Sequence, residues 1–379
     1  MSQQWSSADR LHMSRALELA ERGLYGTDPN PRVGCVIVND GAVVGEGWHR
    51  RAGEPHAEVG ALAQAGERAK GGTLVVTLEP CCHHGRTPPC SDAVIQAGIA
   101  RVVVALTDPD SRVAGGGLQR LRDAGLEVIP GVLEAAAAHQ NRAFVHRVKT
   151  GRPWGLLKWA MSLDGRTALP NGASQWISGA AARAWVHRLR AHCDAVIVGG
   201  GTVRADDPLL TSRGLRTPEP LRVVLSRSLD LPAAARLWTT AEAPTLLAHG
   251  PAVEAADGES GRLLEALGAA GVMATALPRC EPLALLEQLA SRGCNRVLWE
   301  CGPALAAAAL QQGCVQELAV VIAPKLLGGL AARTPLGELG FTAMDQVIPL
   351  QGLTLQQLEP DVVVQSLVPP LSAAGVRAH

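Results

Sequence analysis

The sequence predicts an α/β protein of two domains, and both its length and its pattern of apolar residues indicate this. The chain has 379 residues, which is long for one domain and comfortable for two. Short β-branched runs alternate with segments of helical periodicity, and this alternation occurs once before and once after residues 149–153. That Gly- and Pro-containing segment is the expected linker, so we predict domains at residues 1–150 and 151–379.

The first domain is expected to open with an amphipathic helix over residues 10–23, where Met13, Ala16, Leu17 and Ala20 have helical spacing. A strand at 33–38 leads into the hairpin turn Asn39-Asp40-Gly41 and a return strand from Val43. The remaining predicted elements are strands at 73–78, 101–106 and 127–129 and helices at 92–97, 118–124 and 135–148. This order predicts a layered domain with a mostly parallel interior.

A second alternating series follows the linker. Its predicted strands are 155–160, 194–198, 221–225, 296–299 and 317–323, and its predicted helices are 179–191, 283–291 and 303–312. Residues 240–280 are rich in Ala and Gly and poorly periodic, so no element is assigned there.

Composition excludes several classes of protein. The 35 basic and 35 acidic side chains cancel, which argues against polyanion binding as the main function. Hydrophobic residues make up 47%, too many for a disordered chain, yet no apolar run approaches the ~18 residues of a membrane span. Nine cysteines without an export signal favour metal ligands or buried thiols over disulfides. We expect a cytoplasmic protein with no nucleic-acid or membrane partner.

One histidine and two cysteines carry the strongest chemical signal. His56, Cys81 and Cys90 form a three-ligand zinc set whose fourth position is open for water, as in catalytic sites. Zinc lowers the pKa of bound water toward neutrality, and Glu58, near the start of an expected helix, is placed to carry that water's proton. His-x-Glu followed by Pro-Cys and a second Cys is typical of zinc-dependent nucleobase deaminases.

The spacing of the cysteines departs from the short form of that signature. Eight residues separate Cys81 from Cys90, so the chain carries a variant form. The alternative interpretation is a structural zinc site, with Cys82, His83 or His84 as fourth ligand. That interpretation leaves Glu58 without a role.

Four segments of the first half, residues 30–34, 45–49, 55–58 and 78–90, resemble the deaminase of riboflavin biosynthesis. The long loop between the cysteines, with Gly-x-Thr-Pro-Pro at 85–89, separates that family from cytidine and tRNA-adenosine deaminases. The resemblance implies a cytidine-deaminase-like three-layer domain, with four residues at the pyrimidine substrate: Asn30, His49, Arg86 and Asp108.

The chain departs from this family after the strand at 101–106. Asp110 stands where the family has an amide, and Gly116 stands where it has a cation. Both changes remove groups that would favour a substrate phosphate, and Arg112 is the candidate replacement cation.

In the second half, two predicted strands run into glycine-bearing turns, at residues 199–201 and 300–303. A helix N-terminus behind such a turn offers free N–H groups to a phosphate, although neither turn is a GxGxxG motif, so a Rossmann fold is not predicted. Segments 152–166, 174–179, 188–190 and 199–208 resemble the riboflavin-pathway reductase, which implies a dihydrofolate-reductase-like α/β domain.

This second resemblance implies two sets of contacts. The substrate contacts are Lys158, Ser174, Ser178, Arg190, Arg213 and Glu300, and the dinucleotide contacts are Ala160, Trp176, Thr202, Asp206, Gly302, Pro303 and Ala304. Ser226 and Arg227 replace a family Asp, which removes repulsion against a ribose 2′-phosphate and supplies a cation for it, so we predict NADPH over NADH. Cys301 replaces a family Gly and is expected to crowd the pyrophosphate.

The two resemblances together imply a bifunctional enzyme of riboflavin biosynthesis that uses Zn²⁺ and NADPH. The first reaction is zinc-hydroxide deamination of 2,5-diamino-6-(5-phosphoribosylamino)pyrimidin-4-one, and the second is hydride reduction of the ribosyl C1′ to the ribitylamino uracil phosphate. Two alternatives stay open: an active deaminase with an impaired or re-purposed reductase half, and a nucleic-acid base deaminase. Zero net charge and scarce aromatics weigh against the latter. We expect a small-molecule substrate and a homo-oligomer.

Overall fold

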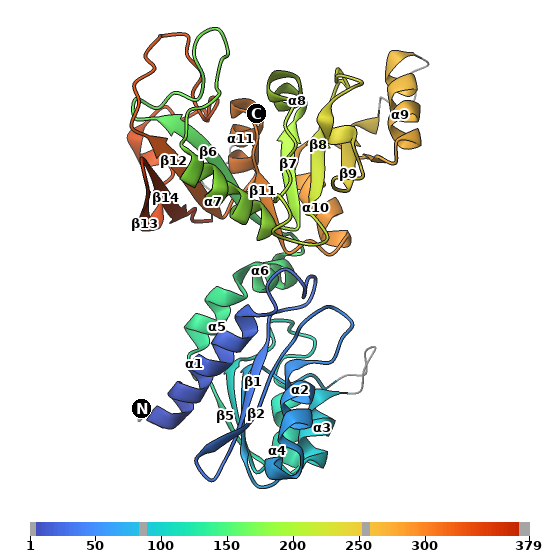
Figure 1. The fold of residues 1–379 in the computed structure, drawn as a ribbon, viewed down its shortest axis with the longest axis vertical. Coiled ribbons are helices and arrows are strands. Elements are labelled where there is room, and N and C mark those ends of the chain that lie inside the picture. Colours follow the sequence, from blue (N-terminus) through green and yellow to red (C-terminus); the bar gives the residue numbers. More distant parts are fainter. Residues whose placement is uncertain (1–4, 83–88, 252–257, 371–379) are drawn as a thin grey trace. The chain divides into compact units, whose positions relative to one another are not determined.

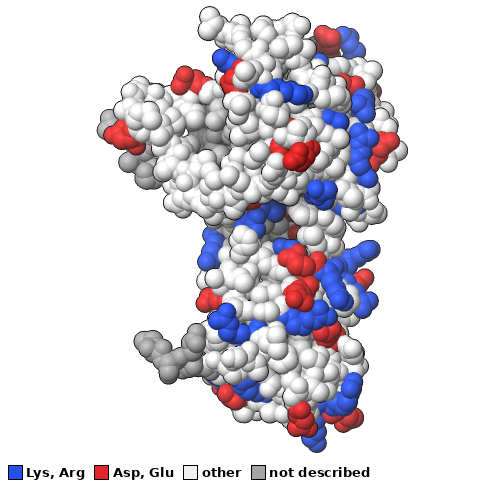
Figure 2. Space-filling model, turned by 60° about the vertical axis from the view of Figure 1, so that its left-hand side comes forward, with Lys and Arg blue, Asp and Glu red and all other residues white. Residues whose placement is uncertain are grey.

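The computed structural model describes residues 5–82, 89–251 and 258–370 (Figure 1). The chain divides into two compact units, Met1–Gly151 and Arg152–His379. No helix within the described ranges is long and apolar enough to cross a membrane. On the face drawn in Figure 2, basic and acidic side chains are interspersed, as the balanced composition leads one to expect.

The first unit contains a five-stranded sheet with the order β2-β1-β3-β4-β5. Its strands are β1 (Gly34–Asn39), β2 (Ala42–Trp48), β3 (Thr73–Leu78), β4 (Arg101–Leu106) and β5 (Glu127–Pro130). Only β3-β4 and β4-β5 are parallel, because β1 pairs antiparallel with both β2 and β3. The sequence predicts a mostly parallel interior, but only two of the four pairings among the described strands are parallel.

Helices cover both faces of this sheet and complete three layers (Figure 1). One layer contains α1 (Ser7–Glu21) and α5 (Glu134–Gln140), and the other contains α2 (Ala57–Ala65), α3 (Cys90–Gln96) and α4 (Gly116–Asp123). The helix predicted over 135–148 is two helices, α5 and α6 (Arg142–Thr150), with Asn141 between them. Asn141 breaks the run because its side chain bonds both the N–H and the C=O of Arg32, at 2.9 Å each.

Glycines let two helices approach the sheet closely. A Cβ at Gly34 in β1 would lie 1.9 Å from the carbonyl oxygen of Ala16 in α1, and a Cβ at Gly47 in β2 would lie 2.2 Å from that of Ala57 in α2. Any larger residue would push the helix away. The close approach matters for function, because α2 begins directly after His56.

The second unit contains a nine-stranded sheet with the order β10-β9-β8-β7-β11-β6-β12-β14-β13. The pairings from β10 to β12 are parallel, and β14 and β13 join antiparallel at the edge. The strands are β6 (Trp154–Ser162), β7 (Ala195–Gly199), β8 (Leu221–Leu225), β9 (Thr245–His249), β10 (Met273–Ala276), β11 (Arg296–Trp299), β12 (Glu317–Ala323), β13 (Gln351–Leu358) and β14 (Asp361–Leu367).

Each face of this sheet has its own apolar core, and alternate residues of one strand enter different cores. In β6, Leu156 belongs to the core that includes residues of α7 (Ala180–Ala191), α8 (Gly200–Asp206) and α9 (Glu259–Ala269), whereas Leu157 belongs to the core that includes residues of α10 (Pro282–Ser291) and α11 (Pro303–Gln311). This period of two is the pleat of a strand buried on both faces. The parallel pairing of β6, β11 and β7 places their carboxyl ends at one end of the sheet, where parallel α/β sheets bind ligands.

Candidate active sites

The three predicted zinc ligands come together in the first unit. His56 immediately precedes α2, Cys90 is the first residue of α3, and Cys81 follows β3. Their ligand atoms all lie within 4.8 Å of one another, with His56 Nδ1 3.1 Å from Cys90 Sγ and 3.8 Å from Cys81 Sγ. Hydrogen bonds from Cys90 and His56 lower the pKa of the Cys81 thiol to about 4, which suits a zinc ligand.

Glu58 lies at the start of α2 and is 3% exposed. Burial raises the pKa of its carboxyl to about 7. Its Oε2 atom is buried and has no hydrogen-bond partner among the described residues. A buried, unpaired carboxylate oxygen beside a His/Cys/Cys set is the arrangement that a proton carrier at a zinc-bound water requires, so the residues present fit a zinc ion.

The alternative of a structural zinc site had three candidate fourth ligands. Cys82 does not belong to the cluster, and its Sγ lies 3.0 Å from where a Cβ of Gly116 would be. His83 and His84 lie outside the described residues, as does Arg86, the predicted substrate-binding cation.

Asn30 and His49, both predicted to bind the pyrimidine, contact each other and lie beside the zinc ligands. Asn30 Nδ2 is 3.2 Å from His49 Nε2, and the His49 ring stands edge-on to that of His56 at 5.2 Å. Burial lowers the pKa of His49, so its ring is neutral and its Nε2 can accept from the Asn30 amide. The pair presents amide and imidazole groups next to the metal cluster.

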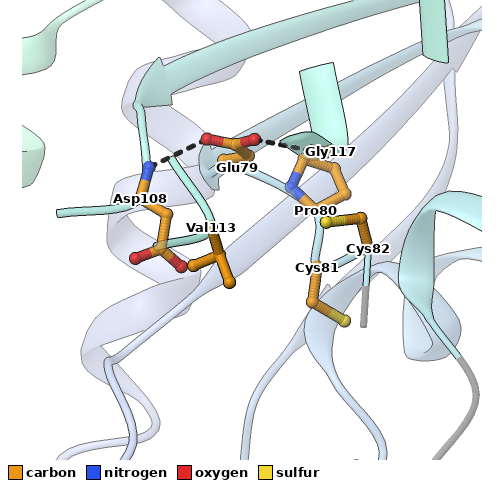
Figure 3. Close-up of a pocket in the computed structure, with 7 residues that line it drawn as sticks. All are labelled: Glu79, Pro80, Cys81, Cys82, Asp108, Val113 and Gly117. Atoms are coloured by element: carbon orange, nitrogen blue, oxygen red, sulfur yellow. Dashed lines mark hydrogen bonds between the residues drawn. The ribbon is translucent and has the colours of Figure 1, made fainter. Parts of the chain in front are cut away.

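Asp108 is held by a residue that sequence reasoning missed. The backbone N–H of Asp108 donates to the buried carboxylate of Glu79 at 3.0 Å (Figure 3). Asp110 donates its N–H to Asp108 Oδ1 and binds the Arg112 guanidinium at 2.5 Å, so that cation is already paired. The sequence shows an acidic residue at position 79, but nothing in it shows that backbone N–H groups surround the carboxylate.

In the second unit, Lys158, Arg190 and Glu300 form one cluster. Arg190 binds Glu300 through two hydrogen bonds of 2.6 and 3.1 Å, and Lys158 Nζ lies 3.6 Å from Glu300 Oε2. The two cations hold the pKa of Glu300 at about 2 despite its burial. Burial lowers the pKa of Lys158. The cluster combines residues of β6, α7 and the turn after β11, three elements that meet at the sheet edge.

A hollow of about 740 Å³ adjoins the first of the two glycine turns identified in the sequence, residues 199–201, whereas no residue of the 300–303 turn lines it. It brings the 199–201 turn against the start of α11 and is rimmed by three arginines, Arg204, Arg227 and Arg279. Its other lining residues are Leu225, Cys280, Glu281, Pro282, Ala304, Leu305, Ala308 and Gln312. The volume and the cationic rim suit part of a phosphorylated dinucleotide.

The other predicted reductase residues lie around these two features. Ser226 is buried, and its Oγ lies 3.2 Å from where a Cβ of Gly200 would be. Thr202 Oγ1 lies 3.9 Å from where a Cβ of Gly302 would be. Ser174 Oγ donates to Asp206 at 3.5 Å.

Several further predicted contacts have neighbours outside the hollow. Trp176 is 63% exposed, and its carbonyl accepts from Lys325. The Ser178 carbonyl accepts from Arg183, the Pro303 carbonyl accepts from the Gly337 N–H, and Arg213 is exposed. Ala160, at β6, packs against the core that contains α7.

Cys301 was expected to crowd the cofactor pyrophosphate. It does not line the hollow, and it packs against the apolar core that contains α10 and α11. Burial raises the pKa of its thiol to about 12, as expected for an inert core cysteine.

Comparisons with known proteins agree with both halves of the chain. Residues 6–106 match the family described as the cytidine and deoxycytidylate deaminase zinc-binding region, and residues 153–364 match the RibD C-terminal domain. The riboflavin biosynthesis protein RibD of Synechocystis is 51% identical over 354 residues, which cover 93% of this chain and 95% of that protein. The RibD protein of Escherichia coli is 45% identical over 84% of this chain and 89% of its own length.

This chain belongs to the RibD family. The RibD structure of Acinetobacter baumannii, form 1, has a TM-score of 0.85 at 42% identity and covers 95% of this chain and 99% of its own. A second RibD-like structure, a diaminohydroxyphosphoribosylaminopyrimidine deaminase/5-amino-6-(5-phosphoribosylamino)uracil reductase from Thermotoga maritima, has a TM-score of 0.83 at 33% identity, with 95% and 99% covered.

Membership of the RibD family confirms the predicted fold class, a cytidine-deaminase-like domain followed by a RibD reductase domain. It also confirms a bifunctional deaminase and reductase of riboflavin biosynthesis that acts on a small molecule with Zn²⁺ and NADPH as cofactors. Neither an impaired reductase half nor a nucleic-acid base deaminase is favoured.

Proposed function

We propose that the first unit deaminates 2,5-diamino-6-(5-phosphoribosylamino)pyrimidin-4-one and that the second unit then reduces the ribosyl C1′ of the product with NADPH. The observation that carries the proposal is the buried His56, Cys81 and Cys90 cluster with the unpaired Glu58 oxygen beside it. The Lys158-Arg190-Glu300 cluster and the adjoining hollow support the second reaction.

In the deaminase unit, His56, Cys81 and Cys90 would hold a zinc ion, which would supply Lewis-acid activation of water. Glu58 takes a proton from that water and delivers it to the departing ammonia, because its buried carboxylate has an oxygen with no other partner. Asn30 and His49 orient the pyrimidine ring, since they contact each other and the His49 ring lies 5.2 Å from that of His56.

In the reductase unit, catalysis is positioning of the nicotinamide against C1′, and no nucleophilic side chain is required. Arg190 and Glu300 hold each other rigidly, and Lys158, in the middle of β6, lies beside them. These groups offer a cation and a carboxylate to the hydroxyl and phosphate groups of the substrate. The 199–201 turn and α11 support the dinucleotide at the hollow.

The decisive experiment is mass spectrometry of the diaminopyrimidine substrate after incubation with zinc-loaded protein, with and without NADPH. We expect deaminated product alone without NADPH, and a further gain of two hydrogens only when NADPH is present. Deamination that stops there in the presence of NADPH would contradict the reductase half of the proposal. No reaction in either case would contradict the deaminase half, and the reductase half is then tested with the deaminated intermediate supplied directly.

Arg227 supports a preference for NADPH over NADH. Its side chain lines the hollow and has no hydrogen bond or ion pair to the described residues, so it is available for the ribose 2′-phosphate. We expect Arg227→Ala to lower kcat/KM for NADPH by about tenfold or more and to leave kcat/KM for NADH unchanged. Arg262→Ala, at an exposed position of α9, is the matched control. Equal kcat/KM for both cofactors, unchanged in Arg227→Ala, would overturn the assignment.

The predicted homo-oligomer is supported by the edge strand β13. Leu353 and Leu355 in β13 are 60% and 67% exposed, and an unpaired apolar edge is suited to pairing with a second copy. Analytical ultracentrifugation is expected to show a dimer or larger species that Leu355→Lys converts to monomer; a monomeric parent chain would contradict this. A cytoplasmic location stays a prediction from the sequence.

A further inference from the structure

Glu79 is a buried carboxylate to which the predicted chemistry gives no role. It is 6% exposed, and it lies two residues before the predicted zinc ligand Cys81. Four backbone N–H groups donate to its two oxygens: those of Asp108 and Gly115 to Oε2, each at 3.0 Å, and those of Gly117 and Leu118 to Oε1, at 2.8 and 3.1 Å. Figure 3 shows the carboxylate between the Asp108 and Gly117 segments.

These bonds tie together both ends of one loop. Asp108 opens the loop that follows β4, and Gly115, Gly117 and Leu118 belong to its end and to the first turn of α4. Hydrogen bonds to an ionised carboxylate are the stronger kind, and the negative charge also complements the N-terminus of a helix. One side chain therefore closes the whole 108–118 loop.

The loop also packs tightly on the segment that carries the zinc ligand. A Cβ at Gly117 would lie 2.0 Å from the carbonyl oxygen of Pro80, and a Cβ at Gly116 would lie 3.0 Å from Cys82 Sγ. Glu79, Pro80 and Cys81 are consecutive in the sequence. A shift of Glu79, which binds the loop, would therefore also shift Cys81, the predicted zinc ligand. A hollow between the 79–82 segment and the 108–118 loop is lined by Glu79, Pro80, Cys81, Cys82, Asp108, Val113 and Gly117.

We propose that Glu79 is a positioning residue of the deaminase site, which fixes the distance between the zinc ligands and the substrate-binding carboxylate of Asp108 through the backbone of the 108–118 loop. This inference rests on the proposed function, because it takes Asp108 as a substrate contact. Glu79 itself touches neither the zinc ligands' metal-binding atoms nor a reacting group; it acts through Asp108. Its loss should therefore weaken substrate binding more than the chemical step.

The test is Glu79→Gln in the full chain. The amide keeps the size of the side chain, but its NH₂ group faces N–H donors and cannot accept from them. We expect KM for the diaminopyrimidine substrate to rise by about tenfold or more while kcat changes by less than about threefold. Zinc content and NADPH oxidation with the deaminated intermediate should equal those of the parent chain. Hydrogen exchange at the amides of residues 115–118 should accelerate.

Two further variants separate positioning from general stability. Asp9→Asn removes the charge of another buried carboxylate of the same unit. Asp9 pairs with Arg101, away from the loop, so this variant should leave KM unchanged. Gly117→Ala keeps the Glu79 side chain but displaces the loop, because the added Cβ would lie 2.0 Å from the Pro80 carbonyl oxygen and 3.1 Å from Glu79 Oε1, and it should reproduce the rise in KM.

The outcomes distinguish the inference from the proposed function on which it rests. A parent chain that does not deaminate the substrate would overturn the proposed function. A parent chain that does, with KM unaltered in Glu79→Gln or equally altered in Asp9→Asn, would overturn only the role of Glu79. Loss of zinc from Glu79→Gln would also overturn it, because the residue would then serve the metal site.

Discussion

Glu58 differs from the other acidic side chains of the first unit because its buried oxygen accepts no hydrogen bond from any described residue. Glu79, in contrast, has four donors, and Asp9 is bound by Ser6 and Arg101. An unpaired buried acceptor has a free-energy cost, and folding tolerates it where a ligand or a catalytic step uses the group. This contrast supports the proposed roles of Glu58 in proton transfer and of Glu79 in positioning.

Replacing the Glu58 carboxylate should therefore stop deamination without releasing zinc. We expect Glu58→Gln to lower kcat by about 10²–10⁴-fold, because the amide cannot carry the proton, while the three ligands stay intact. Mass spectrometry of the substrate and zinc analysis of the same preparation check both parts. Glu67→Gln, at an exposed position, is the matched control. Full activity in Glu58→Gln would remove it from the mechanism.

Among the secondary-structure elements, those with a strong local signal could be predicted and those that depend on distant contacts could not. Strands such as β3, β4 and β8 match their predicted bounds because each is a short β-branched run buried on both faces. β9, α9 and β10 occupy the Ala- and Gly-rich stretch that was left unassigned. β13 and β14 form by antiparallel pairing at the sheet edge, which periodicity does not reveal.

The same distinction applies to the two sites. The metal cluster could be predicted because the sequence shows the types of its ligand residues and the spacing between them. The role of Glu79 could not, because it acts through backbone N–H groups, which do not distinguish one residue from another in the sequence. The cation-lined hollow needed the fold as well, since three strands, β8, β9 and β10, separate Arg204 from Arg279 in the chain, and the two residues line one hollow only when the sheet forms. Spacing shows which side chains can react, and the tertiary fold decides which are held in place.

The attachment of α1 to the sheet makes the first unit sensitive to acid. Asp9 caps α1 with Ser6 and binds Arg101 of β4 at 2.6 and 2.9 Å, and the bond to Arg101 lowers its pKa to about 2. A pKa below the unfolded value means that this contribution is complete above the ordinary pKa of 3.8 and is lost as the pH falls toward 2.

Asp9→Asn should accordingly destabilise the first unit near neutral pH by about 2 kcal/mol and by progressively less as the pH falls below about 4. Hydrogen exchange of the α1 and β4 peptides in both chains, compared at each pH, measures the difference. A difference that stays constant down to about pH 3 would show that the ion pair is not its cause.

For the whole molecule, the division of the chain into two units predicts that the two activities depend on zinc differently. All three predicted zinc ligands belong to Met1–Gly151, whereas the Lys158-Arg190-Glu300 cluster and the arginine-lined hollow belong to Arg152–His379. Each unit also has apolar clusters of its own, so loss of the metal from one leaves the core of the other intact.

Removal of zinc by a chelator should therefore abolish deamination and leave NADPH oxidation unchanged when the deaminated intermediate is supplied directly. The paired measurement is made on one preparation of the full chain, before and after chelation and again after zinc is restored, which should return deamination alone. If chelation also lowers NADPH oxidation by more than about twofold, reversibly with zinc, the reductase unit must sense the metal site, and the two units would be coupled parts of one enzyme.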